Sequence, residues 1–366
     1  MCSFFSGGTP SSSKKEYYDG NIPFIRSGEL HDDQTELFIT EDGLKNSAAK
    51  MVEVGDLLLA LYGATSGDIA ISKINGAINQ AILCIRTEQS KKFIESIWYK
   101  HAGKLLQTYL QGGQGNLSAD IVKNISFYFA TIEEQKKLAK FISLLDERIS
   151  TQNKIIEKYK SLIQAVIYQK KTDGIRMGDW QKTELSKVLQ ERNEKNINGY
   201  DVCSVSVSQG VVNQIEYLGR SFAAKETSHY NVVKYGDIVY TKSPTGDFPY
   251  GIVKRSCIKD GVAVSPLYGV YMPANDHIGV ILHFYFMQPN NASNYLHPLI
   301  QKGAKNTINI TNRRFLENSI PLPKTENEAL CIANALKTIQ KKIDTEKGLL
   351  QSYEKEKEYL LCRMFI

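Results

Sequence analysis

Two stretches of the chain repeat apolar residues in alternating steps of four and three. Residues 131–171 contain neither glycine nor proline, and charged residues fill most other positions of both stretches. A 3.5-residue repeat held over about five heptads is typical of a coiled coil, whereas a helix buried in a large core would carry fewer charges. We therefore predict two long helices whose seams form one antiparallel pair, interrupted at Gln152 in the first helix and at Glu346 and Lys357 in the second. The predicted seam is Leu138, Ile142, Leu145, Ile149, Ile156 and Tyr159 in the first stretch, and Ile332, Leu336, Ile339, Ile343, Leu350 and Tyr353 in the second.

The segments before each long helix are predicted to be rich in strands. Short apolar runs between glycine turns at 57–62, 80–85, 237–240 and 268–272 predict buried strands. Residues 93–110 have helical spacing. Ser118 and Thr311 are suited to cap short helices, since each side-chain oxygen can accept from an unpaired backbone N–H. The polar stretch 170–179, with two glycines, predicts a hinge between the halves.

The second half of the chain repeats the first. Gly55-Asp56 recurs as Gly236-Asp237, the segment 115–118 corresponds to 308–311, and the long helices correspond at an offset of 194. Strand-rich segments that each precede a long helix predict an α+β protein. The duplication predicts that its two halves are related by an internal pseudo-twofold axis. We divide it into a first strand-rich domain (1–130), a first helix (131–171), a second strand-rich domain (172–324) and a second helix (325–366). The segment 180–189 has no counterpart before Cys2, which suggests that the first domain lacks an initial strand.

The composition is that of a globular protein. Of 366 residues, 42% are hydrophobic and 23% charged, and no apolar run approaches the length of a membrane span. The first ten residues do not resemble a signal peptide. Six cysteines lie far apart without a C-x-x-C pair, so we expect no zinc module and no disulfide framework. Reduced, mostly buried thiols in a cytoplasmic protein are expected instead.

The net charge of +6 is unevenly distributed. Residues 1–130 carry 12 basic and 14 acidic groups, whereas residues 172–324 carry 17 and 13. The densest basic cluster is Lys302, Lys305, Arg313 and Arg314, with no acidic residue between Asp276 and Glu317. This cluster is either a solvated face or a surface for a polyanion.

The sequence carries no signature of an enzyme. It lacks the phosphate-binding loop of P-loop proteins, the dinucleotide-binding glycine motif and the Asn/Asp-Pro-Pro-Tyr motif of amino-methyltransferases. The glycines of 63–67 are those of a turn that joins two strands. The six histidines form no metal-ligand pair, so we expect no metal site. A metal-dependent nuclease is a remote alternative, in which the carboxylates and the lysine would be those of Glu191, Glu194 and Lys195.

Two similar modules with a rigid spacer suit a target that has two separated recognition patches, and duplex DNA is such a target. Arginine, asparagine and glutamine can pair with base edges, while lysine and backbone amides hold phosphates. For Asn116 and Asn309, a role at a helix entry is an equal alternative. The candidate DNA-binding residues are Arg26, Ser27, Thr65, Gln111, Gln114 and Asn116 in the first half, and Lys242, Ser243, Thr245, Lys305, Asn306, Asn309, Arg313 and Arg314 in the second.

Several strings together resemble a known family. They are 7–11 (GGTPS), 22–30 (IPFIRSGEL), 55–58 (GDLL), 62–64 (YGA), and 132–137 (IEEQKK) leading into 144–149 (LLDERI). Across essentially the whole chain, they resemble the specificity subunit of type I restriction–modification systems. Two departures are Ala130, where the family commonly has proline, and Glu328-Ala329, where the first helix has Glu134-Gln135.

The resemblance implies a non-catalytic subunit with two target-recognition domains. Each domain would read one half of a split, asymmetric DNA site. The paired helices would act as spacer and dock two methyltransferase subunits and, through them, restriction subunits. S-adenosylmethionine and ATP would be bound by those partners and not by this chain.

Two other functions are consistent with parts of the sequence. One is a coiled-coil scaffold whose strand-rich domains bind protein, and the other is a nuclease or methyltransferase that acts alone. The missing motifs disfavour the second. Salt dependence separates the first from DNA binding, because contacts to phosphates weaken steeply as salt is added.

Overall fold

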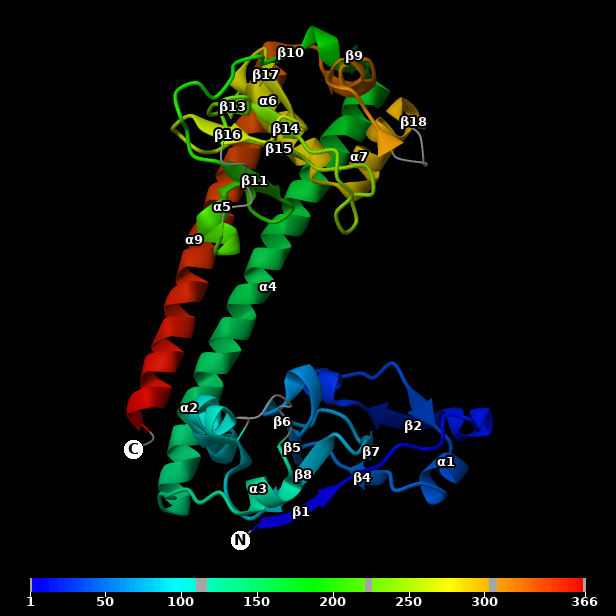
Figure 1. The fold of residues 1–366 in the computed structure, drawn as a ribbon, viewed down its shortest axis with the longest axis vertical. Helices are drawn as coiled ribbons and strands as arrows, with labels where there is room; N and C mark the ends of the chain where they lie inside the picture. The colour runs from blue at the N-terminus through cyan, green and yellow to red at the C-terminus, as the bar shows by residue number, and fades with distance from the viewer. Residues whose placement is uncertain (1, 110–116, 221–225, 303–307, 365–366) are drawn as a thin grey trace. The chain divides into compact units, whose positions relative to one another are not determined.

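The computed structural model describes residues 2–109, 117–220, 226–302 and 308–364 of an α+β protein. The chain forms two compact units, one of residues 1–153 with 349–366 and one of residues 154–348. Two long helices, α4 (Ile132–Met177) and α9 (Glu326–Met364), contribute to both units (Figure 1). Each unit therefore contains a strand-rich domain, the start of one long helix and the end of the other.

The strand-rich domain of the first unit has two four-stranded sheets. One is antiparallel, in the order β1 (Cys2–Ser6), β8 (Ile82–Thr87), β5 (Leu57–Ala60) and β6 (Ile69–Ile71). The other has the order β3 (Phe38–Ile39), β2 (Tyr18–Ile25), β7 (Gly76–Ile78) and β4 (Lys50–Val52), with β2 and β7 parallel. Its helices are η1 (Lys15–Tyr17), η2 (Ser27–Glu29), α1 (Glu41–Lys45), η3 (Gly63–Thr65), α2 (Lys91–Tyr109) and α3 (Ala119–Lys123).

The second unit is built on one four-stranded antiparallel sheet and four strand pairs. The sheet has the order β10 (Leu189–Glu191), β17 (Gly269–Pro273), β14 (Ile238–Tyr240) and β15 (Val253–Arg255). The pairs are β11 (Cys203–Ser206) with β12 (Gly210–Asn213), β13 (Asn231–Val233) with β16 (Val262–Val264), β18 (Gln301–Lys302) with β19 (Ile308–Asn309), and β9 (Trp180–Glu184) with β20 (Ser319–Pro323). Its helices are η4 (Leu185–Lys187), α5 (Gln214–Leu218), α6 (Asp276–Phe286), α7 (Pro289–Leu296), η5 (His297–Leu299) and α8 (Asn312–Phe315).

The two units share one arrangement, as the duplication predicts. In chain order, β5, β6, β8 and α2 correspond to β14, β15, β17 and α6, and the two sheets have the same strand order. Gly55 and Gly236 adopt φ of 92° and 91°, a left-handed conformation that glycine reaches without steric cost. Asp56 and Asp237 then accept a hydrogen bond from the backbone N–H three residues earlier, at 3.0 and 2.8 Å. The internal repeat is therefore confirmed, and it includes the backbone conformation and hydrogen bond of this Gly-Asp turn.

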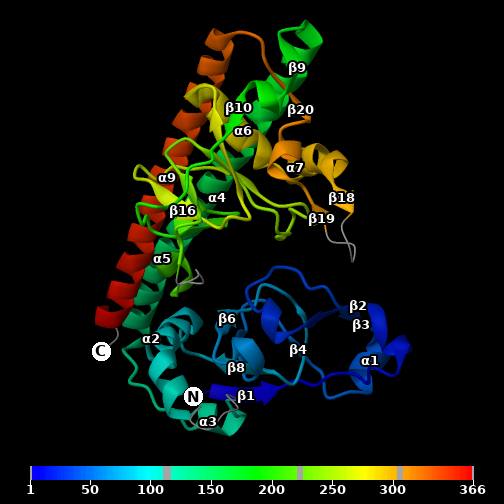
Figure 2. The ribbon, with the colours of Figure 1, turned by 45° about the horizontal axis from the view of Figure 1, so that its top comes forward.

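The start of α4 and the end of α9 pair in antiparallel fashion within the first unit. Asp146 of α4 binds Lys357 of α9 at 2.6 Å, and the Arg148 guanidinium lies over the Tyr353 ring at 5.0 Å. One residue before Asp146 in α4, Leu145 shares a cluster with Leu361 of α9. Later residues of α4 therefore contact earlier residues of α9, so the two helices are antiparallel. The predicted antiparallel pairing is confirmed in the first unit, where the two helices lie side by side in both views (Figures 1 and 2).

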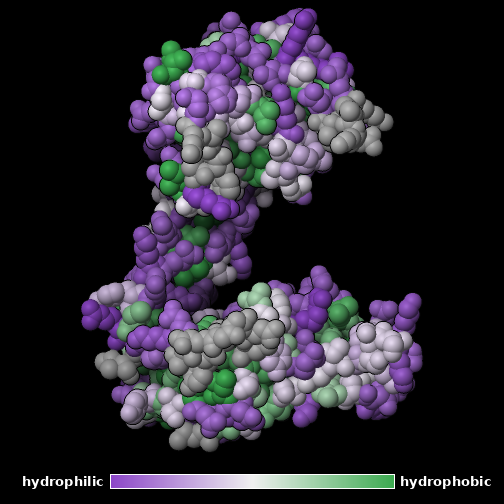
Figure 3. Space-filling model, viewed as in Figure 1, coloured by the Kyte–Doolittle hydropathy of each residue, from purple (hydrophilic) through white to green (hydrophobic). Residues whose placement is uncertain are grey.

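The seam positions of both helices lie on their inner sides. Five seam residues are at most 4% exposed, namely Ile142, Ile156, Ile332, Leu336 and Ile343, and Gln152 interrupts the apolar seam at 5%. The other seam residues named above are partly buried: Leu138, Leu145, Ile149, Tyr159, Ile339, Leu350 and Tyr353. Mostly hydrophilic residues cover the visible outer face of the helices (Figure 3).

The first long helix continues beyond its predicted end at Lys171. It runs through Gly174 to Met177, so most of the predicted hinge is helical. Gly174 is buried, and a Cβ there would lie 1.9 Å from Cδ1 of Trp180. The indole donates a hydrogen bond to Glu328 Oε1 at 2.8 Å. Gly174 is thus a contact surface for Trp180 rather than a helix stop, which the sequence pattern did not indicate.

Substituting alanine for two helical glycines should have opposite effects on stability. Gly174→Ala should lower the free energy of unfolding by about 1–3 kcal/mol, because the methyl group overlaps the Trp180 ring. Gly348→Ala, at a position of α9 with nothing within 4 Å of the added Cβ, should raise it by up to about 1 kcal/mol. Urea unfolding of the two full-length variants measures both. A stabilised Gly174→Ala variant would contradict the packing role.

The expectation of mostly buried thiols was wrong. Cys84 and Cys203 are buried, Cys2 is partly buried, and Cys257, Cys331 and Cys362 are exposed. Two of the exposed thiols lie at outer positions of α9, where the heptad phase already places them on the surface. Across the described ranges, no helix is both long and apolar enough to cross a membrane.

Candidate nucleic-acid interface

In the second unit, a polar loop follows the central strand β14 and carries three of the candidate residues. Ser243 and Thr245 are exposed, and Lys242 is partly buried. The loop is shaped by reciprocal backbone hydrogen bonds between Thr245 and Phe248, at 3.1 and 2.9 Å. Its exposed hydroxyls can donate to phosphates or to base edges.

The base of this loop meets β10 and helix α8. Burial lowers the pKa of Lys242, and the neighbouring Glu191 carboxylate opposes that shift. Glu191 accepts a hydrogen bond of 2.7 Å from the Asn312 side chain at the start of α8. Tyr271 of β17 donates to the Asn312 carbonyl at 3.0 Å. The structure therefore brings the loop together with the first turn of α8, although they are about 70 residues apart in the sequence.

Helix α8 presents one exposed cation beside the loop. Thr311 caps it as predicted, accepting from the Arg314 N–H at 3.2 Å. Arg313 is exposed, whereas the Arg314 guanidinium donates to the Leu299 carbonyl at 2.8 Å and lies 3.7 Å from Glu317. The two neighbouring arginines thus have different environments. Asn309 is exposed on β19, and Lys305 and Asn306 lie outside the described residues.

The corresponding place in the first unit has fewer charges. The turn after β5 is η3, in which Thr65 is partly buried, and Tyr62 just before it is 38% exposed. The Leu117 N–H donates to the Leu61 carbonyl at 2.9 Å and holds the entry of α3 against the end of β5. Ser118 caps α3 as predicted, accepting from the Ile121 N–H at 3.1 Å. Gln111, Gln114 and Asn116 lie outside the described residues.

Arg26 and Ser27 lie on a second loop of the first unit. Ser27 is partly buried in η2. His31, two residues after η2, lies 2.9 Å from Asp68, three residues after η3. The Arg26 guanidinium lies 2.9 Å from Glu29 and 2.7 Å from Glu36. Both carboxylates therefore neutralise Arg26, which sequence analysis offered as a DNA-binding cation.

The Glu29 carboxylate is the anchor of this loop. Burial acts to raise its pKa, but hydrogen bonds from the Arg26 side chain and from the backbone N–H of Glu36 and Arg26 outweigh burial. Together they lower the pKa to about 2. Glu29 therefore stays ionised at neutral pH, and Asp32 and Asp33 line the same hollow. A phosphate would be repelled on this side of Arg26.

The repeated Gly-Asp motif is structural rather than catalytic. Asp56 is 6% exposed and binds Arg86 at 2.7 Å, and Asp237 is 2% exposed and binds Arg192 at 2.7 Å. Arg86 comes from β8, the neighbour of β5, and Arg192 directly follows β10, which is separated from β14 by β17. Burial acts to raise the pKa of Asp56, but Arg86 lowers it below its usual range.

The remote nuclease alternative gains no support from the described residues. Glu194 binds Lys234 at 2.8 Å and Arg192 at 3.3 Å, and Glu191 is held by Asn312. Within the described ranges, no group of three or more histidine, cysteine or acidic side chains could hold a metal ion. Sequence analysis did not identify Tyr62 and Asn312 beside these loops; the only signal for Asn312 was its position directly after the Thr311 cap.

Known proteins are similar to this chain in sequence and in fold. Residues 1–160 match the family model of the type I restriction modification DNA specificity domain. The chain is 23% identical to the MjaVIII specificity subunit of a type I restriction enzyme from Methanocaldococcus jannaschii, over 98% of this chain and 88% of that one. The chain is similar to type I specificity subunits along nearly its whole length, and its first 160 residues match their specificity domain.

Two further comparisons agree with this similarity. The MjaIX specificity subunit of the same organism is 30% identical over 42% of this chain and 38% of its own length. The crystal structure of the type I S subunit from M. genitalium has the same fold, with a TM-score of 0.59 at 12% identity, covering 100% of this chain and 96% of that one. The two relatives are named specificity subunits, which are non-catalytic components of type I complexes.

Proposed function

We propose that this specificity-subunit homologue reads a split, asymmetric DNA site, with one half-site contacted by each unit. The observation that carries the proposal is a pair of loops that occurs once in each unit, on sheets of the same strand order. In the first unit the pair is the turn after β5 and the start of α3, and in the second unit it is the loop after β14 and the start of α8. The chemistry of the loops differs: polar and basic in the second unit, aromatic and nearly neutral in the first. Two similar frames with unlike loops suit two half-sites of different sequence.

The proposed partners are duplex DNA, two methyltransferase subunits and, through them, restriction subunits, in the cytoplasm. The outer faces of the long helices support docking of methyltransferase subunits, because they expose large apolar side chains. In the first unit, Phe141 and Leu144 of α4 are 41% and 54% exposed, and Tyr359 of α9 is 60% exposed. S-adenosylmethionine and ATP belong to those partners in this proposal. The proposed division of the chain remains 1–130, 131–171, 172–324 and 325–366.

The neighbouring arginines of α8 give a matched test of DNA contact. In Arg313→Ala, duplex DNA binding should weaken, and the slope of log affinity against log salt should fall by about 0.9, because one phosphate contact is lost. In Arg314→Ala, the slope should stay unchanged, since that side chain is bound to Leu299 and Glu317. Fluorescence anisotropy with a non-specific duplex at several salt concentrations measures both. Binding that is independent of salt would favour the protein-binding scaffold.

A further inference from the structure

The turn after β5 lacks most of the side chains that pair with bases. Residues 57–67 contain no charged residue, no asparagine and no glutamine, whereas the corresponding loop after β14 carries Lys242. Tyr62 occupies the position of Ser243 in the internal repeat, since each lies six residues after the aspartate of its Gly-Asp turn. At matching positions, the first unit therefore has a large aromatic ring and the second unit a small hydroxyl.

The turn exposes two apolar groups. Tyr62 is 38% exposed, and its backbone is extended, with φ of −132° and ψ of 161°. Ala64 is also exposed, and Gly63 between them has a φ of 80°, which glycine adopts without steric cost. Among the residues that the structure describes, none forms a hydrogen bond with the Tyr62 hydroxyl. The ring and the methyl group are therefore accessible to a ligand.

The turn is fixed on the sheet and on α2. The Gly67 N–H donates to the Ala60 carbonyl at 2.8 Å, and the Trp98 indole of α2 donates to the Gly67 carbonyl at 2.7 Å. The Ser66 hydroxyl donates to the Leu61 carbonyl at 3.0 Å and closes the turn. All of these residues belong to the first unit. A binding group held in this way loses little conformational entropy when it meets its ligand.

The chemistry of base pairs in the major groove limits what this turn can recognise. Guanine pairs with arginine or lysine, adenine with asparagine or glutamine, and cytosine with aspartate or glutamate. The turn contains none of these residue types. The C5 methyl group of thymine is different, because it is recognised by apolar contact. An exposed ring and an exposed methyl group can make such a contact.

We propose that Tyr62 and Ala64 recognise a thymine, through its C5 methyl group in the major groove, in the half-site that the first unit contacts. This inference rests on the proposed function and adds the base that the turn selects. The ring of Tyr62 makes the contact, and its hydroxyl is not required. Ser243 has no ring, so the loop of the second unit does not select a base in this way.

Replacing thymine by uracil tests the contact, because uracil lacks only the C5 methyl group. The split motif is first determined by selection from a random duplex library, with the full-length chain bound to its methyltransferase subunit. Uracil then replaces each thymine of that motif in turn. At one position, the wild-type complex should bind the uracil duplex about fourfold more weakly, the effect of one buried methyl-sized group. Tyr62→Ala should bind the two duplexes equally.

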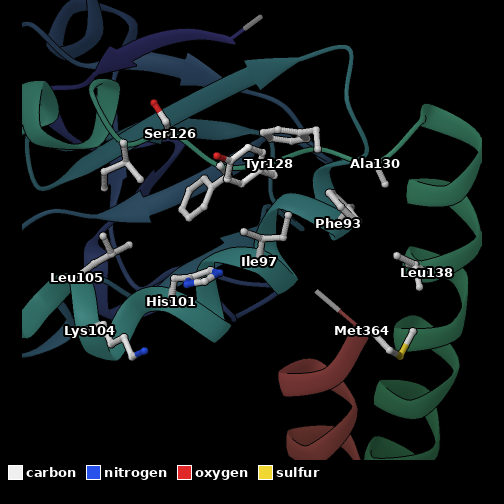
Figure 4. A pocket seen from close by; sticks show the side chains of 13 residues that line it. Phe93, Ile97, His101, Lys104, Leu105, Ser126, Tyr128, Ala130, Leu138 and Met364 are labelled. Carbon is white, nitrogen blue, oxygen red and sulfur yellow. The ribbon is translucent and has the colours of Figure 1, made fainter. Parts of the chain in front are cut away.

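Two further variants separate the ring from general effects of substitution. Tyr62→Phe keeps the ring and should keep the fourfold preference. Tyr128 is another tyrosine of the first unit, 94% exposed beside a groove that Ile97 and Leu138 line (Figure 4). Tyr128→Ala should also keep the wild-type preference. Melting temperatures show whether each variant is folded.

The salt dependence of Tyr62→Ala distinguishes a base contact from a phosphate contact. The slope of log affinity against log salt should equal that of the wild type, because the ring neutralises no phosphate. If uracil is tolerated at every thymine, or if Tyr62→Ala loses the same affinity as the wild type, the inference is wrong while the proposed function stands. If the selection yields no split motif, both are wrong.

Discussion

Adding seven residues to each long helix should widen the unread gap between the two half-sites by about three base pairs. One heptad adds about 10 Å of helix at 1.5 Å per residue, and one base pair spans about 3.4 Å of DNA. Insertion after Gln152 and after Glu346 falls within two residues of the boundaries between the units, at 153/154 and 348/349. Contacts within each unit are therefore kept, and a whole heptad keeps the seam in phase.

Sequencing of methylated sites from cells that carry the variant measures the gap. The two half-site sequences should stay the same, because the recognition loops are untouched. A matched insertion of five residues, which takes the seam out of phase, serves as control and should abolish methylation. A changed half-site with an unchanged gap would show that the helices do not set the spacing.

Replacing Ile142 by aspartate should destabilise the chain by roughly 4 kcal/mol. Ile142 is 1% exposed and lies in a cluster with Phe93 and Ile97 of α2, with Leu361 and Met364 nearby. The variant loses the burial of an aliphatic side chain and places a carboxylate in an apolar site. Because this cluster joins α2 to both long helices, we expect the pairing of α4 with α9 in the first unit to be lost. Chemical unfolding of the isolated chain measures the effect.

Leu144→Asp is the matched control, two residues along the same helix. Leu144 is 54% exposed, so the change in unfolding free energy should stay within about 0.5 kcal/mol. In the proposed assembly, that variant should instead weaken binding of a methyltransferase subunit. Equal destabilisation by the two substitutions would contradict the assignment of the inner and outer faces of α4.

The long helices could be predicted because a heptad repeat reports burial directly. Polar Gln152 and Glu346 were recognised as parts of the seam only through their spacing. The end of α4 at Met177 was not predicted, because Gly174 was taken as part of a hinge. The role of Gly174 depends on Trp180, which is six residues away in the sequence and packs on the helix in the folded protein. Local propensity carries no signal for such a contact.

The candidate site was harder to predict, since residue type does not reveal the partner of a side chain. Arg313 and Arg314 are adjacent in the sequence, but only Arg313 is exposed, because Arg314 reaches the Leu299 carbonyl. Arg26 was chosen as a cation for DNA, yet Glu29 and Glu36 neutralise it. Glu29 is only three residues away, so this pairing could have been suspected, whereas the approach of Asn312 to Glu191 required the fold.

The central claim is that this chain determines which DNA sequence a type I complex recognises. Mapping of methylated adenines in cells that carry its methyltransferase subunit, with and without the chain, tests the claim most directly. The account predicts one split motif that appears only when the chain is present. It also predicts that one half of the motif changes when residues 172–324 are replaced by the corresponding segment of another specificity subunit. An identical set of methylated sites with and without the chain would contradict the account.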